Sequence, residues 1–406
     1  MRILQVNKFH YNRGGADKYY LSLIKALEQK GHQVAAFSMY HPKNIASPYS
    51  RYFVSRLSFN EGGLRNALKT PGRMIYSFEA KRKFKKLVLD FKPEIIHIHN
   101  IYHQISPSIL DIAARFKIPV VMHLHDYKLI CPNYQLFVNG KVCDACRPNK
   151  YFWCYRKKCF KNSRIKSALA VLEMYIHHSL LKIYKKNITE FIAPSTFMKQ
   201  KLVDFGWNSE KINIVINPFD AEMSIAKGEE AKQEEEYLLY FGRLGQEKGL
   251  EILIQAAALT KSHLKFVGIG TEEDKLKKLA EKLKVQAEFL GFKNGPELKY
   301  IILRSKAIII PSIWFENMSL SLLEALNLGK IVIASNIGGI PEIIKHNENG
   351  LLFEPGNVHD LADKINSLGR LDIELIKQNA KESVRDLNAE NNLQQVEAIY
   401  QKILNK

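Results

Sequence analysis

The segment from Lys306 to Ile344 constrains the fold of this 406-residue chain more than any other part. Its apolar run from Ala307 to Ile310 ends at a proline and predicts a buried strand. A loop follows, and Asn317 or Ser319 can cap the leucine-rich helix after it. A second apolar run, Ile331 to Ala334, predicts another strand. This order predicts a parallel α/β fold, whose ligands bind where strands end in loops.

Two carboxylates of this segment, Glu316 in the loop and Glu324 in the helix, are eight residues apart. Glu324 follows Leu320 by four residues and Leu323 by one, so it lies near the apolar face of the helix. A carboxylate in that position needs a hydrogen-bonding partner, which a sugar or a ribose would supply. The alternative is a solvated loop residue and a solvated charge on a helix face.

Strands and helices alternate along the whole chain and predict α/β architecture with doubly wound parallel sheets. We expect a first domain over 1–217, including a cysteine-rich loop at 131–160, and a second over 218–387. A final helix within 388–406 is expected to pack back on the first domain. The segment 217–236, rich in Lys and Glu, is the expected linker.

The net charge of +19 is unevenly distributed between these domains. Residues 1–217 contain 36 Lys and Arg but 13 Asp and Glu, whereas the remainder contains 24 and 28. A basic first half suggests contact with an anionic surface or substrate, and nucleic acid and anionic lipid both fit that description. No apolar run reaches the roughly 18 residues that span a bilayer. We therefore expect a cytoplasmic protein, or one attached only to a membrane surface.

All five cysteines fall between Cys131 and Cys159. A structural zinc ion could be held by four of them: Cys143, Cys146, Cys154 and Cys159. The alternative is a set of free thiols, because the second pair is spaced by four residues and Cys131 is left over. Aromatic and basic side chains alternate in the same loop and could bind lipid headgroups or a nucleic acid.

Three further groups of residues are candidates for ligand contacts. Gly14 and Gly15 precede a helix, where backbone N–H groups can bind phosphate, but a lone glycine pair is a weak signal and a tight turn is the alternative. Arg243 and Lys248 flank a strand-to-helix loop and suit a diphosphate, or are solvated surface cations. His125 follows another strand, where histidines can bind a metal, act in acid–base chemistry or form simple hydrogen bonds. Metal binding is poorly supported, because no carboxylate-rich cluster accompanies these histidines.

Together these segments resemble the family 4 glycosyltransferases, which are retaining enzymes of the GT-B fold with two Rossmann-like domains facing a central cleft. The resemblance covers nearly the whole chain and is strongest in the second half. It rests on seven blocks in the family's order: 14–17, His125-Asp126, 193–195, 241–249, Pro311-Ser312 with Glu316 and Glu324, 338–342 and 350–356. The chain departs from the family pattern at Asn317 and Ser319, where glycine is common.

The resemblance implies transfer of a sugar, of hexosyltransferase type, from a nucleotide-diphosphate sugar to a hydroxyl group of a glycan or lipid-linked acceptor. The second domain would bind the donor and the first the acceptor. Arg243 and Lys248 would stabilise the departing diphosphate, and Gly14 and Gly15 would add backbone donors. The remaining expected contacts are His125 and Glu316 at the sugar, Glu324 at the ribose, Met318, Ser319 and Leu320 through their N–H groups, and Gly291 near the base.

The sequence contains no D-x-D motif, so the resemblance implies a reaction in which no metal bridges the diphosphate. The expected role is synthesis of a cell-surface polysaccharide or glycolipid at the inner face of a membrane. Two alternatives remain open: another GT-B chemistry, such as a nucleotide-sugar epimerase or a phosphorylase, and a basic nucleic-acid-binding protein. The second alternative explains none of the motifs in the second half.

Overall fold

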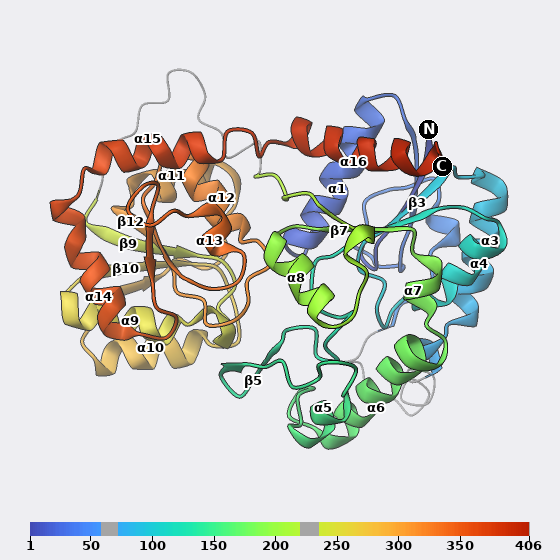
Figure 1. Cartoon of the computed structure of the whole chain (residues 1–406). Coiled ribbons are helices and arrows are strands. Elements are labelled where there is room, and N and C mark those ends of the chain that lie inside the picture. Colours follow the sequence, from blue (N-terminus) through green and yellow to red (C-terminus); the bar gives the residue numbers. More distant parts are fainter. Residues whose placement is uncertain (58–71, 220–234, 406) are drawn as a thin grey trace. The chain divides into compact units, whose positions relative to one another are not determined.

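The computed structural model describes residues 1–57, 72–219 and 235–405, which form two compact units (Figure 1). The first comprises Met1–Leu136, Asp144–Val215 and the chain from Asn392 onward, and the second comprises Ile216–Asn391 together with Phe137–Cys143. Most of the expected linker, 220–234, lies outside the described residues. Among those described, no helix is long and apolar enough to cross a bilayer.

The first unit is built on a six-stranded sheet in the order β2-β1-β3-β4-β7-β8, and every neighbouring pair is parallel. Its strands are β1 (Arg2–Val6), β2 (Gln33–Phe37), β3 (Ile95–Ile98), β4 (Val120–His123), β7 (Glu190–Ala193) and β8 (Ile212–Ile214). The reversal of strand order next to β1 makes the sheet doubly wound, as expected. A ligand site is therefore favoured at the carboxyl ends of β1, β3 and β4.

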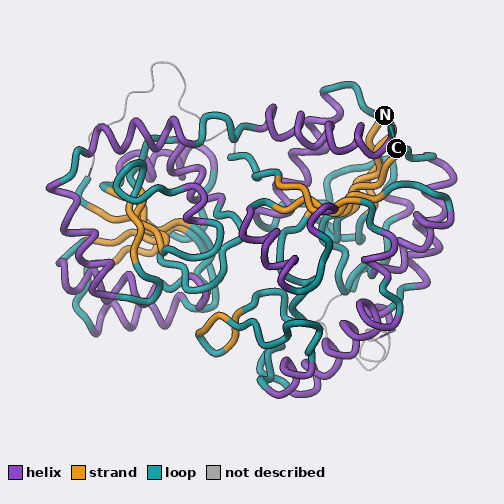
Figure 2. The backbone as a smooth tube through the Cα atoms, viewed as in Figure 1, coloured by secondary structure: helices purple, strands orange, loops and turns teal. Residues whose placement is uncertain are grey.

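Helices flank this sheet (Figure 2). They are α1 (Gly15–Gln29), α3 (Phe78–Phe91), α4 (Leu110–Arg115), α5 (Phe152–Arg156), α6 (Arg164–Met174), the π-helix η3 (Tyr175–Leu180), α7 (Ile183–Asn187), α8 (Thr196–Asp204) and α16 (Ala389–Leu404). The basic helix α3 buries its apolar face, including Phe84, Leu87 and Val88, in the first unit. Its cations therefore cover an ordinary core.

The final helix α16 belongs to the core of the first unit, although the whole second unit precedes it in the chain. Its buried face packs with residues of β1, β3 and α1. Tyr400 hydrogen bonds to Gln5 and to His97, and Asn392 accepts a hydrogen bond from Tyr19. The apolar core of the first unit is thus built from residues at both ends of the sequence.

The second unit has a parallel six-stranded sheet of order β11-β10-β9-β12-β13-β14. The strands are β9 (Tyr237–Phe241), β10 (His263–Val267), β11 (Ala287–Phe289), β12 (Ala307–Ile310), β13 (Val332–Ser335) and β14 (Leu351–Phe353). The helices are α9 (Leu250–Thr260), α10 (Glu273–Lys282), α11 (Gly295–Arg304), α12 (Leu320–Asn327), α13 (Ile340–Ile343), α14 (Val358–Ser367) and α15 (Ile373–Ser383). Two apolar clusters hold them to the sheet, so this unit is a second Rossmann-like domain.

Two local expectations were wrong. The sequence predicts one long, partly amphipathic helix over 164–186, but α6 passes into η3 and Lys182 then adopts a positive φ of 51° before α7 begins. The loop 131–160 does not belong wholly to the first unit, because its short hairpin, β5 (Phe137–Val138) with β6 (Lys141–Val142), forms a sheet of its own and is grouped with the second unit.

Candidate functional site

In the second unit, an ion pair between a half-buried lysine and a buried carboxylate joins the loops that follow β9 and β12. The Nζ atom of Lys248 lies 2.6 Å from Oε1 of Glu316, and the hydroxyl of Ser312 donates to the same oxygen at 2.6 Å. Lys248 also lies 5.1 Å from the centre of the Trp314 ring. The two expected residues are therefore brought together, and Ser312 and Trp314 complete a group that their spacing in the sequence did not reveal.

Two glycines allow these loops to approach each other. Gly249, directly after Lys248, has a φ of +66°, and a Cβ there would lie 2.0 Å from the carbonyl oxygen of Pro311. Gly338 has a φ of +65°, and its Cβ would lie 2.3 Å from the carbonyl oxygen of Glu316. The N–H of Gly339 donates to that same carbonyl. The backbone thus fixes the position of Glu316 from both sides.

Glu316 is ionised in this environment. Burial alone would raise the pKa of its carboxyl group, but the neighbouring ammonium of Lys248 and the hydroxyl of Ser312 outweigh that effect, and the pKa lies below its ordinary value. A carboxylate can accept about four hydrogen bonds, so Glu316 keeps capacity for hydroxyl groups of a ligand.

Arg243 lies in the loop after β9, and its guanidinium contacts Glu247 at 2.6 Å. The side chain of Arg243 is 59% exposed, whereas that of Glu247 is buried. The hydroxyl of Tyr240 donates to the carbonyl of Arg243 at 2.8 Å and holds the backbone of this loop. Arg243 is therefore a positioned but accessible cation, and the carboxylate that positions it was not singled out from the sequence.

The other residues expected to contact the sugar donor lie in or next to α12. Ser319 is its N-cap, as expected, and its hydroxyl accepts a hydrogen bond from the N–H of Leu322. Met318 is buried and Leu320 half-buried, so both belong to the packing of this unit. Glu324 is 9% exposed within α12, on the buried side of the helix, where the sequence placed it.

Gly291, the residue expected near the base, has a φ of +68° and space around its Cα. Its carbonyl accepts the N–H of Gly268 at 2.7 Å. A Cβ on Gly268 would lie 1.8 Å from the carbonyl oxygen of Gly242, so the backbones after β9, β10 and β11 are in close contact. These three loops therefore lie side by side at the carboxyl ends of the strands of the second sheet.

In the first unit, Gly14 is the N-cap of α1 and contributes no side chain there. A Cβ on Gly14 would meet nothing within 4 Å, so the helix start is open at this point. Gly15 begins the helix. Asp17, in the first turn, is buried and accepts a hydrogen bond of 2.8 Å from Asn7. Burial raises the pKa of Asp17 and lowers that of the neighbouring Lys8.

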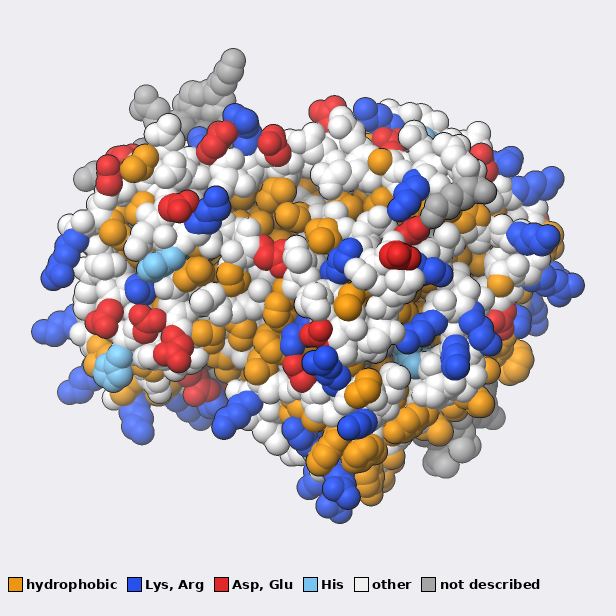
Figure 3. Space-filling model, viewed as in Figure 1, with side chains coloured by type: hydrophobic (Ala, Val, Ile, Leu, Met, Phe, Trp, Pro, Cys, Tyr) orange, Lys and Arg blue, Asp and Glu red, His pale blue; other side chains and the backbone are white. Residues whose placement is uncertain are grey.

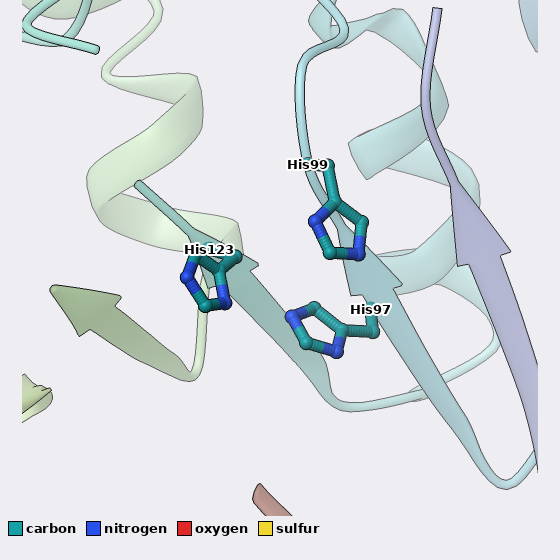
Figure 4. Close-up of side chains that lie close together, drawn as sticks. All are labelled: His97, His99 and His123. Atoms are coloured by element: carbon teal, nitrogen blue, oxygen red, sulfur yellow. The ribbon is translucent and has the colours of Figure 1, made fainter. Parts of the chain in front are cut away.

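His125 is the last of four histidines whose rings stack along the ends of β3 and β4. Figure 4 shows three of them: His97 from β3, His99 directly after β3, and His123 from β4. The ring of His125 is stacked 4.6 Å from that of His123 and 5.2 Å from that of His99. Burial lowers the pKa of His125 well below its ordinary value, and His97 and His99 behave alike. These three imidazoles are neutral.

A chain of hydrogen bonds sets the tautomer of His125. The amide nitrogen of Gln5 donates to Tyr400, so its Oε1 faces Nε2 of His99 at 3.0 Å, and that nitrogen carries the proton. Nδ1 of His99 is then an acceptor for Nε2 of His125 at 2.9 Å. His125 therefore carries its proton on Nε2, and its Nδ1 can accept a hydrogen bond.

Nitrogen atoms of His97, His99 and His123 lie within 4.8 Å of one another, close enough for a metal ion. Ring orientation argues against that use, because the planes are inclined by only 16° to 22° and lone pairs of stacked rings do not converge. Both nitrogens of His99 are also engaged with Gln5 and His125. The array is better described as a hydrogen-bonded polar layer. The alternation of His97 and His99 along one strand was the sequence signal for it.

The five cysteines are free thiols. In the part of the chain that is described, no three of their sulfur atoms form a group within 4.8 Å of one another. Cys154 and Cys159 do form a hydrogen-bonded pair, which lowers the pKa of Cys159. Zinc binding at Cys143, Cys146, Cys154 and Cys159 stays a prediction.

Comparison with known proteins agrees with this architecture. The family model of glycosyl transferases group 1 matches residues 223–383, and that of Glycosyltransferase Family 4 matches residues 13–223. An uncharacterized 42.6 kDa protein in the cps region of Klebsiella pneumoniae is 26% identical over 370 residues, covering 84% of this chain and 87% of that protein. Sulfoquinovosyl transferase SQD2 of Arabidopsis thaliana is 27% identical over 68% of this chain, which spans 50% of the relative.

Two solved structures have the same fold over nearly the whole chain. HepE of Anabaena, in complex with UDP, aligns with 99% of this chain and 100% of its own at 18% identity and a TM-score of 0.69. Sucrose-phosphate synthase of Thermosynechococcus elongatus aligns with 99% of this chain and 98% of its own at 17% identity and a TM-score of 0.70. With two Rossmann-like domains and matches to both family models, the chain is a glycosyltransferase of family 4 with the GT-B fold.

Proposed function

We propose that this enzyme transfers a hexose, with retention of anomeric configuration and without a metal, from a nucleotide-diphosphate sugar to a hydroxyl acceptor. The observation that carries the proposal is the Lys248–Glu316–Ser312 group at the carboxyl ends of β9 and β12, where open α/β sheets bind ligands. The UDP that HepE contains supports a nucleotide-linked donor.

Breaking a glycosyl–phosphate bond places negative charge on the departing diphosphate. Cations that are already fixed before the reaction stabilise that charge more in the transition state than in the ground state. Lys248 is fixed by Glu316, and Arg243 by Glu247, on the same strand-to-helix loop. We assign both to the diphosphate, with N–H groups at Gly14 and Gly15 as further donors.

Glu316 and Glu324 are assigned to hydroxyl groups of the donor. Glu316 is ionised and already oriented, so it can accept from the sugar. Glu324 is assigned to the ribose, the N–H groups of Met318, Ser319 and Leu320 to the sugar or phosphate, and Gly291 to the base. His125, with its Nδ1 as acceptor, is assigned to a hydroxyl of the sugar ring.

The acceptor is proposed to be a glycan or a lipid-linked sugar in cell-surface polysaccharide or glycolipid synthesis. The cps-region relative of Klebsiella and the amylovoran biosynthesis glycosyltransferase AmsK of Erwinia amylovora support this assignment. We place the enzyme in the cytoplasm, at the inner face of the membrane.

Thermal shift measurements with UDP, GDP, ADP and their sugars test the donor assignment. One nucleotide is expected to raise the midpoint, since a ligand at 100 times its dissociation constant adds about 2.7 kcal/mol. Glu324→Gln should weaken the response, whereas Glu348→Gln, a change of an exposed residue, should not. No shift with any nucleotide, or an unchanged shift in Glu324→Gln, would contradict the assignment.

An epimerase is the second candidate, because its donor would bind in the same way. Incubation of the enzyme with donor alone separates the two. Release of an epimerised nucleotide sugar would replace the transferase proposal, whereas slow hydrolysis to nucleotide diphosphate and free sugar agrees with it. The anomeric configuration of the transferred sugar, read by NMR, tests retention.

A further inference from the structure

The surface of α5, α6 and η3 carries several strongly exposed apolar side chains of the first unit together with many exposed Lys and Arg residues. No residue assigned to the donor site lies among them. Figure 3 shows apolar and basic side chains side by side over the end of this unit where Figure 1 places α5 and α6. We define the α6 face as the exposed residues of 152–186.

Helix α6 has a buried inner side of mixed character and an apolar side that faces outward. Its inner side holds Ser167, Ala170, Glu173 and Met174, all buried. Its outer side holds Ile165, Ala168, Leu172 and Tyr175, spaced by three, four and three residues and all exposed. Ile165 is 84% exposed and Leu172 is 50% exposed. A helix at a protein surface normally turns polar residues outward, so the outer stripe requires another explanation.

The outer stripe is not needed to hold the helix. Glu173 on the inner side binds Nζ of Lys128 at 2.8 Å and Nε2 of His103 at 3.2 Å, both in the loops that follow the sheet. Next in the chain, His177 binds the carbonyl of Ile75 at 2.7 Å. Buried charged contacts of this kind fix α6 and η3 firmly, and they make the outer side a rigid platform.

Further large apolar side chains extend the stripe at both ends. Phe152 and Tyr155 of α5 are 41% and 45% exposed, and Leu180 and Leu181 after α6 are 74% and 37% exposed. Tyrosine and phenylalanine next to aliphatic residues are typical of segments that insert at the boundary between lipid headgroups and acyl chains.

The net positive charge of the same segment indicates an anionic partner. Residues 152–186 contain nine Lys and Arg, and their single carboxylate, Glu173, is buried inside. All nine cationic residues are exposed. Apolar side chains surrounded by cations, without an exposed carboxylate, are complementary to a lipid bilayer, whose acyl chains are apolar and whose headgroups are anionic.

We propose that the α6 face docks on the surface of an anionic phospholipid bilayer, with Ile165, Leu172 and Leu180 entering the headgroup region and the surrounding cations contacting lipid phosphates. The proposed function enters only as the reason for docking, which would bring the acceptor domain to a lipid-linked substrate. The docking itself needs no donor and no catalysis.

Flotation of the full chain with vesicles of phosphatidylglycerol and phosphatidylcholine tests the docking. We expect binding to the mixed vesicles at low salt, weaker binding at high salt, and none to phosphatidylcholine alone. Lys158→Gln/Arg164→Gln/Lys166→Gln should weaken binding on the order of 100-fold, because each cation near an anionic surface contributes about fivefold. Ile165→Ser/Leu172→Ser/Leu180→Ser should lower the affinity at every salt concentration.

Matched variants of the second unit are the controls. Lys278→Gln/Lys282→Gln/Lys284→Gln removes three exposed cations, and Leu259→Ser removes a leucine that is 54% exposed. Both should bind vesicles like the parent. Failure to float with anionic vesicles at low salt, or equal losses in the controls, would overturn the proposal. Binding of single-stranded RNA that vesicles cannot displace would also overturn it and would favour a nucleic-acid partner.

Nucleotide thermal shifts on the same samples keep the two proposals separate. Variants of the α6 face should retain the nucleotide response of the parent, because none of their residues belongs to the donor site. If the parent floats with anionic vesicles but no nucleotide shifts its thermal midpoint, the proposed function is contradicted and the docking proposal stands. A parent that responds to a nucleotide but does not float would do the reverse.

Discussion

Lys248 is the residue on which the proposed chemistry of the second unit depends most. Lys248→Met removes a fixed cation from the proposed leaving-group site, so kcat should fall by roughly 10²–10³-fold, the range for loss of one preorganised electrostatic contact. Steady-state kinetics with the donor identified by thermal shift will measure it. Lys278→Met, at an exposed position of α10, should leave kcat unchanged.

The same change should alter the titration of Glu316. In the parent, Lys248 helps hold the pKa of Glu316 below its ordinary value against the effect of burial. Without that ammonium, burial dominates and the pKa rises. The acid limb of log(kcat/KM) against pH should therefore move to higher pH in Lys248→Met, measured from the residual activity. A limb at the parent's position would show that Glu316 does not control it.

His99 is a positioning residue, since it acts through His125. His99→Phe removes the acceptor of the His125 Nε2–H, and nitrogen-15 NMR should then show His125 changing from one tautomer to a mixture. Tyr19→Phe is the matched control, because it removes only the hydroxyl that donates to Asn392 and leaves the bonds of His99 to Gln5 and to His125 in place. An unchanged His125 spectrum in His99→Phe would exclude the relay.

At the scale of residues, the sequence identified Lys248 and Glu316 separately but not their ion pair. They are 68 residues apart, and their contact depends on the parallel pairing of β9 with β12 and on the tight turn at Gly249. The sequence did not single out Glu247 as the partner of Arg243, although the two residues are only four positions apart. An exposed helical Glu and a buried Glu look alike in a sequence.

At the scale of elements, Gly249 is the connection most sensitive to substitution. Gly249→Ala adds left-handed backbone strain and a Cβ 2.0 Å from a carbonyl oxygen, so we expect a loss of about 3 kcal/mol or more in unfolding free energy. Gly356 has a φ of +85° with nothing within 4 Å, and Gly356→Ala should cost only about 1–2 kcal/mol. Urea denaturation of both variants measures the difference. Equal losses would show that the close approach adds nothing.

The strands were predicted well because each is a short apolar run that ends at a turn signal, and apolar runs buried on both faces are typical of parallel sheets. The break between η3 and α7 was not predicted. Lys182 adopts a left-handed conformation there, and lysine, unlike glycine or asparagine, does not signal one. The apolar side chains on both sides of α6 also made 164–186 resemble one continuous helix.

At the scale of the whole molecule, the buried pair of Lys128 and Glu173 is the charge interaction whose loss should cost most. Glu173→Gln leaves a buried ammonium without its counter-charge, and we expect a loss of about 3 kcal/mol. Lys128 and the neighbouring histidines hold the pKa of Glu173 far below its ordinary value of 4.5 in spite of burial. The stabilisation is therefore fully present above that value and diminishes as the pH falls below it.

Urea midpoints from pH 7 to pH 3.5 test both statements. The difference between the parent and Glu173→Gln should be largest at neutral pH and should shrink toward pH 3.5. Glu210→Gln, at an exposed position, should match the parent at every pH. A difference that does not depend on pH would mean that packing, and not charge, is what Glu173 provides.

The return of α16 to the first unit has a consequence for synthesis on the ribosome. Leu393, Val396, Ile399 and Tyr400 fill the first core, yet they are translated after every residue of the second unit. The first unit therefore stays incomplete, without part of its apolar core and without the hydroxyl partner of His97, while the second unit is made and can already fold. Nascent chains halted before Asn392 should thus show a protease-resistant second unit and a protease-sensitive first unit, and both should become resistant once α16 has emerged.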